Sequence, residues 1–86
     1  MPRFEIDITR TAEKQLQSAA RNDQERLATA ILRLADQPRP RGCRKLSGFD
    51  DIFRIRVDRF RVIYSVSDAR LVVLILKIGH RREVYR

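Results

Sequence analysis

The sequence predicts an α+β fold with the element order β-α-α-β-β-β, in which an N-terminal helical hairpin packs on a mostly antiparallel sheet. Three patterns support this prediction. Polar and apolar residues alternate over residues 3–8, apolar residues recur at helical spacing between residues 9 and 37, and strand-like runs fill residues 52–78. The chain has 86 residues, so we expect a single domain over residues 1–86.

The two predicted helices have recognisable ends. Thr9 can cap the first helix, and Asn22-Asp23-Gln24-Glu25 resembles a capping box that opens the second. Pro38 is expected to end the second helix, because proline cannot continue one. The apolar stripes that face the sheet are Ala12, Leu16 and Ala19 in the first helix and Leu27, Ile31 and Leu34 in the second.

Residues 38–50 are expected to form a charged loop, because prolines and glycines interrupt them. Strands are expected at residues 52–57, 60–66 and 71–78. The run from Leu71 to Leu76 is apolar on both faces, which is typical of a central strand. A two-residue turn at Asp58-Arg59 would join the first two of these strands, although it lacks the glycine that such turns favour.

The charge of the chain is unevenly distributed. Its net charge is +8, and sixteen of its 19 basic residues are arginine. Residues 1–40 hold seven basic and six acidic residues, whereas residues 41–86 hold twelve and five. Arginine grips phosphate through two hydrogen bonds, so this excess favours a nucleic-acid partner over a membrane surface. A basic surface that serves only solubility is the alternative.

Several classes of protein are disfavoured. The longest apolar run is far too short to span a membrane, and the N-terminus has no signal-peptide pattern. Cys43 is the single cysteine, so an internal disulfide and a cysteine-based zinc site are excluded. We expect a protein of the bacterial or archaeal cytoplasm that needs no metal and no cofactor.

The first two strands of the predicted sheet concentrate arginine on one face. Alternation sends Arg54 and Arg56 to one side of their strand and the apolar residues to the other. A hairpin turn at Asp58-Arg59 would place Arg56 directly opposite Arg61. Like charges in that position destabilise a sheet, which indicates that a polyanion binds there.

The order and spacing of these motifs resemble the RelE/ParE superfamily of bacterial and archaeal toxins from type II toxin–antitoxin pairs. The resemblance covers nearly the whole chain. It is carried by Thr9-x-x-Ala12-x-x-x-Leu16, Pro38-x-Pro40-x-Gly42-x-x-Lys45-Leu46-x-Gly48, Phe53-Arg54-Ile55-Arg56-Val57, Phe60-Arg61-Val62-Ile63-Tyr64 and Gly79-His80-Arg81-Arg82-Glu83-Val84-Tyr85.

The RelE branch of this resemblance implies a ribosome-dependent endoribonuclease. Such a toxin enters the A site of a 70S ribosome and cuts messenger RNA there, by attack of the nucleotide's own 2′-hydroxyl on the adjacent phosphate. It implies no metal. A RelB-like antitoxin would neutralise the toxin, and operator DNA would be bound only indirectly, through that antitoxin.

The resemblance also implies which residues bind and cut RNA. Arg61 falls on a phosphate-binding arginine, Arg81 on the arginine of the last motif and Tyr85 on its C-terminal tyrosine. Arg54 and Arg56 fall where RelE enzymes often carry two lysines. Lys45 matches a basic loop residue, and Arg82 adds a cation beside Arg81.

The exchange of lysine for arginine matters, because arginine effectively cannot lose its proton. Arg54 and Arg56 can stabilise charge but cannot act as a base. His80, the only histidine of the chain, is therefore the expected general base or acid, since it can exchange a proton near neutral pH. Tyr85 could stack on a splayed base or donate a proton. The alternatives are that His80 only packs beside Tyr85 or caps a strand end, and that Tyr85 only anchors the terminus.

Three other functions are compatible with this sequence. The ParE branch of the same superfamily consists of non-enzymatic inhibitors of DNA gyrase, with the same fold. An unrelated RNA-binding module would bind free RNA in a salt-dependent way without cutting it. A toxin that has lost its activity could persist as an antitoxin-bound co-repressor.

Overall fold

The computed structural model describes residues 3–80. In chain order its elements are β1 (Glu5–Ile8), α1 (Arg10–Ser18), α2 (Arg21–Arg33), β2 (Arg44–Lys45), β3 (Ile52–Val57), β4 (Phe60–Ser67) and β5 (Val72–His80). Within these residues the strands form one sheet in the order β1-β5-β4-β3-β2, and β1 runs parallel to β5. The predicted α+β arrangement is confirmed. The difference is β2, a two-residue strand inside the segment expected to be a loop.

The helix ends follow the sequence only in part. Thr9 caps α1 as predicted, since its Oγ1 accepts a hydrogen bond from the Ala12 backbone amide at 3.1 Å. The predicted capping box is wrong, because α2 begins at Arg21 and its N-cap residue makes no side-chain bond. Gln24 instead donates to the carbonyl oxygens of Gln17 and Ala19, which ties α2 to the end of α1. The helix ends at Arg33, so Pro38 does not end it.

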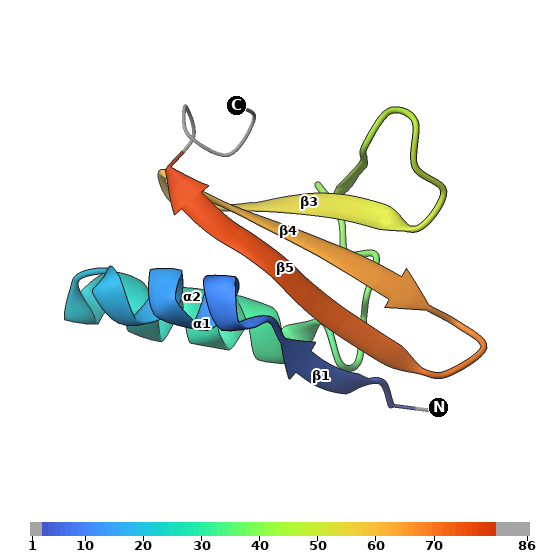
Figure 1. Ribbon diagram of the computed structural model, residues 1–86, viewed down its shortest axis with the longest axis horizontal. Coiled ribbons are helices and arrows are strands. Elements are labelled where there is room, and N and C mark those ends of the chain that lie inside the picture. The colour runs from blue at the N-terminus through green and yellow to red at the C-terminus, as the bar shows by residue number, and fades with distance from the viewer. Residues whose placement is uncertain (1–2, 81–86) are drawn as a thin grey trace.

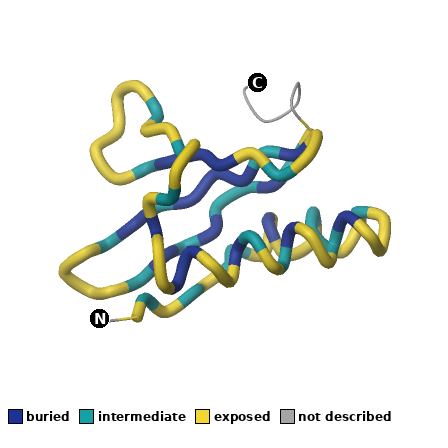
Figure 2. Tube along the Cα trace, turned by 180° about the vertical axis from the view of Figure 1, so that it is seen from behind, coloured by how far each residue is buried: buried dark blue, intermediate teal, exposed yellow. Residues whose placement is uncertain are grey.

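The hydrophobic core lies between the helices and one face of the sheet. Figure 1 shows α1 and α2 together on one side of the sheet, and Figure 2 shows the buried residues gathered where helices and strands face each other. No helix of residues 3–80 is long and apolar enough to cross a membrane. The core side chains that are least exposed are Ala12, Leu27, Leu34, Val62, Tyr64, Val73, Ile75 and Ile78.

Tyr64 carries a hydroxyl group in the middle of this core. The side chain is fully buried, and its hydroxyl donates a hydrogen bond of 2.7 Å to the carbonyl oxygen of Pro38. This bond fixes the segment after α2 against the sheet. It also gives the buried hydroxyl a hydrogen-bond partner, without which its burial would cost free energy.

We expect Tyr64→Phe to lower the free energy of unfolding by about 1–3 kcal/mol, because the Pro38 carbonyl then loses its donor. Urea denaturation at neutral pH measures this difference. Equal midpoints for the two proteins would show that the bond contributes nothing.

The same pair of proteins tests a pH dependence. Burial raises the pKa of the Tyr64 hydroxyl above its ordinary value of 10.0. Above that pH the unfolded chain releases the tyrosine proton while the folded chain keeps it, so unfolding becomes easier as pH rises. The stability gap between wild type and Tyr64→Phe should therefore narrow in alkali. A gap that stays constant would contradict this.

Candidate functional site

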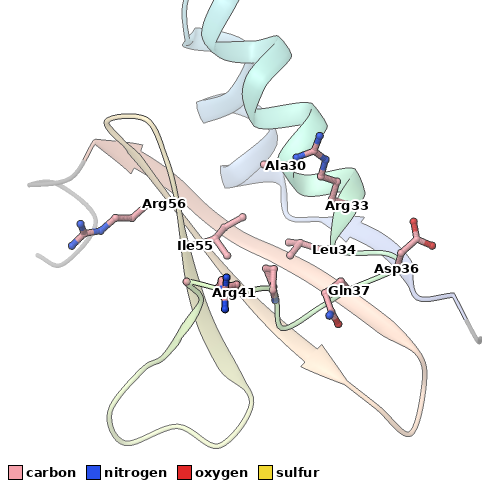
Figure 3. A pocket seen from close by; sticks show the side chains of 10 residues that line it. Ala30, Arg33, Leu34, Asp36, Gln37, Arg41, Ile55 and Arg56 are labelled. Atoms are coloured by element: carbon pink, nitrogen blue, oxygen red, sulfur yellow. The ribbon is translucent and has the colours of Figure 1, made fainter.

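The strand register confirms the predicted arginine pair. Arg56 of β3 lies directly opposite Arg61 of β4, and the next pair, Val57 and Phe60, closes on the two-residue turn. Asp58 takes a positive φ of 60° there, which replaces the glycine that such turns favour. Figure 3 shows Ile55 pointing toward α2 while Arg56 leaves β3 in the opposite direction. The two arginines therefore share the sheet face that the helices do not cover.

A β-bulge adds a lysine to the same face. The register between β4 and β5 shifts at Ile63 and Tyr64, so that Tyr64 lies opposite Ile75 whereas Ile63 lies opposite Lys77. Without the bulge, strict alternation from Ile75 would send Lys77 into the core. Bulges of this kind re-aim a side chain. The signal in the sequence is that two fully buried isoleucines, Ile75 and Ile78, are three residues apart instead of two or four.

The short strand β2 contributes a different residue from the one predicted. Arg44 lies opposite Arg54, whereas Lys45 lies opposite Phe53. Directly opposite residues share a face, so Arg44 joins the arginines and Lys45 does not. Lys45 instead forms an exposed ion pair with Asp50 at 3.8 Å. We call the resulting set the cationic face: Arg44, Arg54, Arg56, Arg61 and Lys77.

The members of the cationic face differ in how open they are. Arg44 and Arg56 are exposed, and Arg61 and Lys77 are half-buried. Arg54 is only 7% exposed, so it does not form part of an open outer face as the alternation had suggested. Its neighbour across β4 is the buried Ile63. The main contribution of Arg54 is therefore its positive charge beneath the surface, and its direct contact with a bound ligand is small.

The structure does not bring His80 to the cationic face. His80 lies opposite Phe60, and Gly79 lies opposite Arg61. The His80 side chain therefore points to the helix side of the sheet, where its ring lies 4.8 Å from the Phe60 ring. Because Gly79 has no side chain, the neighbour of Arg61 on β5 presents only backbone on the open side.

Three predicted site residues, Arg81, Arg82 and Tyr85, lie outside the described residues.

At the opposite end of the sheet from the hairpin turn, Arg39 makes contacts that stabilise the fold. It forms a two-bond ion pair with Asp68, with a shorter distance of 2.7 Å, and its guanidinium lies 5.1 Å from the Phe53 ring centre. The hydrogen bonds from Arg39 lower the pKa of the Asp68 carboxyl.

The cationic face is suited to bind phosphate. Several guanidinium groups and one ammonium project from neighbouring strands, and the hydrogen bonds they make to phosphate are charge-assisted.

The family model for the ParE toxin of type II toxin–antitoxin systems, parDE, matches residues 6–85. The chain belongs to the RelE/ParE toxin family. This decides the class that motif order alone could only suggest.

Solved structures of RelE proteins resemble this RelE/ParE toxin closely. RelE in the archaeal RelE–RelB complex from Pyrococcus horikoshii is 32% identical, with a TM-score of 0.84 over 96% of this chain and 99% of that one. The isolated RelE toxin of Escherichia coli is 28% identical, with a TM-score of 0.79 over 96% and 90% of the two chains. A chain of the intact E. coli RelBE toxin–antitoxin complex, at 24% identity and a TM-score of 0.79 over 93% and 98%, supports the fold.

The toxin also carries an apolar groove beside α2. It has a volume of about 600 Å³ and lies between the second half of α2, residues 36–42 and β3. Ala30, Leu34 and Ile55 form its apolar part, Arg33 and Arg41 lie at its margin, and Arg56 borders it with its side chain pointing away (Figure 3). Leu32, on the outer face of the helical hairpin, is a separate apolar side chain and is 59% exposed.

Proposed function

We propose that this toxin is a ribosome-dependent endoribonuclease that cuts messenger RNA in the ribosomal A site and so inhibits translation. The observation that carries this proposal is the Arg56–Arg61 pair on the open sheet face, reinforced by Arg44 and Lys77. Like charges directly opposite each other cost stability, and a bound polyanion would offset that cost.

The chemistry expected of this face is stabilisation of charge. When a 2′-hydroxyl attacks the adjacent phosphate, negative charge builds on the phosphorane oxygens, and fixed cations lower that barrier. We expect Arg61 and Arg56 to hold these oxygens. The partly covered position of Arg61 between β3 and β5 limits its movement, so little reorganisation is needed during the reaction.

Proton transfer needs a group that can change its charge, which arginine effectively cannot do. Within residues 3–80, Lys77 is the one member of the cationic face that can. Tyr85 and Arg81 stay predictions from the family resemblance. His80, on the other side of the sheet, is not placed to touch the scissile phosphate in this arrangement.

An antitoxin completes the proposal. RelE is found with RelB in the P. horikoshii and E. coli complexes. We propose that a RelB-like partner of this toxin fills the groove beside α2 with apolar side chains. Acidic residues on the partner would then face Arg33 and Arg41 at the margin of the groove. Charge complementarity of this kind speeds association and selects the partner.

A coupled translation extract tests the proposal. We expect added toxin to cut messenger within codons on ribosomes, with products that carry a 2′,3′-cyclic phosphate, and to leave the same RNA intact without ribosomes. Primer extension maps the cuts. A matched reaction with added RelB-like antitoxin should show none. Uncut messenger in the presence of active toxin would reject the nuclease.

A ParE-like inhibitor of DNA gyrase is the second candidate, and the match to the ParE family model favours it. The cationic face would then bind an acidic protein surface or DNA instead of RNA. A supercoiling assay with purified gyrase separates the two, since this candidate requires blocked supercoiling together with intact messenger.

A further inference from the structure

Two like charges lie opposite each other at the end of the β3–β4 hairpin. Arg56 and Arg61 face each other one residue pair behind the turn, and two like charges directly opposite push their strands apart. Strand ends near exposed turns are also the parts of a sheet that open most easily. Contacts on the other side of the sheet join this end of the hairpin to α2 and β5.

Two ion pairs join the turn to the start of α2. Arg59 donates to the carboxylate of Asp23 at 3.3 Å, and Asp23 is only 7% exposed. Arg26 forms an ion pair with Asp58. Asp23 and Arg26 are three residues apart, so they lie on the same side of the helix. Each turn residue thus meets a helix residue of opposite charge.

A ring contact joins the same turn to the end of β5. The His80 ring lies 4.8 Å from the Phe60 ring, with 33° between the ring planes, and the Arg59 guanidinium lies 6.0 Å from the Phe60 ring centre. The end of β5 is itself anchored, because the Ile78 amide donates to the side-chain oxygen of Gln15 at 2.7 Å. Phe60, directly before Arg61 in the chain, therefore contacts both His80 and Arg59.

We propose that these contacts form a clamp on the helix side that positions Arg56 and Arg61 for the phosphate, with His80 acting through Phe60 as a positioning residue. The clamp consists of Asp23–Arg59, Arg26–Asp58 and His80–Phe60. Its effect on cleavage rests on the proposed nuclease function, whereas its effect on the arginine side chains does not. His80 then acts through the contact of its ring with Phe60, and it need not exchange a proton.

Two variants of His80 distinguish a positioning role of its ring from a role as a general base. His80→Phe keeps an aromatic ring against Phe60 but cannot exchange a proton, whereas His80→Ala removes the ring. We expect single-turnover cleavage on saturating ribosomes to stay within about threefold of wild type for His80→Phe, and to fall by at least about tenfold for His80→Ala. The pH profile of cleavage should be the same for wild type and His80→Phe.

A matched pair of aspartate variants tests the rest of the clamp. Asp23→Asn breaks the ion pair with Arg59, and Asp68→Asn breaks the Arg39–Asp68 pair at the other end of the sheet. We expect Asp23→Asn to slow cleavage by about five- to tenfold and Asp68→Asn to leave it unchanged. Thermal unfolding of each variant shows whether the fold is kept.

NMR of arginine side chains gives a readout that does not depend on cleavage. We expect the Nε–Hε signal of Arg61 to shift or broaden in His80→Ala and to stay near its wild-type position in His80→Phe. An unchanged signal in His80→Ala would overturn the clamp. A His80→Phe variant as slow as His80→Ala, with one limb of the pH profile lost, would show that His80 is a base. If wild type does not cut messenger, the nuclease proposal fails and the NMR comparison alone decides the clamp.

Discussion

Arg61→Ala should slow messenger cleavage on ribosomes by about 10²–10³-fold, which corresponds to about 2–4 kcal/mol of barrier. Arg61 lies opposite Arg56 on the open face, and backbone of Gly79 borders it on β5. Arg61 is half-buried, which restricts its side chain, so its loss removes charge stabilisation that mainly benefits the transition state. The measurement is single-turnover cleavage by saturating toxin.

Arg70→Ala is the matched control. It removes the same side chain from the turn between β4 and β5, where Arg70 is exposed at the opposite end of the sheet. We expect its cleavage rate to stay close to that of wild type. If both variants lost activity equally, the effect of Arg61 would be one of overall charge, and a specific phosphate site at the hairpin would be excluded.

Leu27→Ala should lower the free energy of unfolding by about 3 kcal/mol, within the usual range for a buried leucine. Leu27 is fully buried between α2 and the sheet, so the substitution leaves a cavity. A domain of this size has a thin core, and such a loss removes a large share of its stability. Urea denaturation measures the change.

Leu32→Ala provides the comparison within the same helix. Leu32 is 59% exposed, and its truncation should change the unfolding free energy by less than about 0.5 kcal/mol. Similar losses in the two variants would mean that burial does not decide the cost. Leu32→Ala also tests whether the outer face of α2 contributes to antitoxin affinity.

The hairpin that carries the site could be predicted from the sequence because its pattern is long and regular. Six residues of β3 and eight of β4 alternate, and a two-residue turn leaves one register that buries Phe53, Ile55 and Phe60 together. The Arg56–Arg61 pair follows from that register. Asp58 made the turn look unfavourable, yet Asp tolerates the positive φ.

The remaining members of the cationic face could not be predicted in the same way. The strand β2 has two residues, too few to show a period, so nothing in the sequence separated Arg44 from Lys45. The bulge that places Lys77 on this face breaks the period within an apolar run. His80 was expected beside the arginines because the strand was expected to end at residue 78. Instead β5 continues to His80, and its alternation turns the ring to the helix side of the sheet, where the residue stays exposed.

The parallel pairing of β1 with β5 affects how the chain can fold as it is made. Glu5 pairs with Val72, and the Thr9 hydroxyl binds the carbonyl oxygen of Leu76, 67 residues away. Closing so large a loop is slow. The first strand of the described sheet therefore lacks its partner strand until β5 has been synthesised, and we expect β1 to join the sheet late in folding.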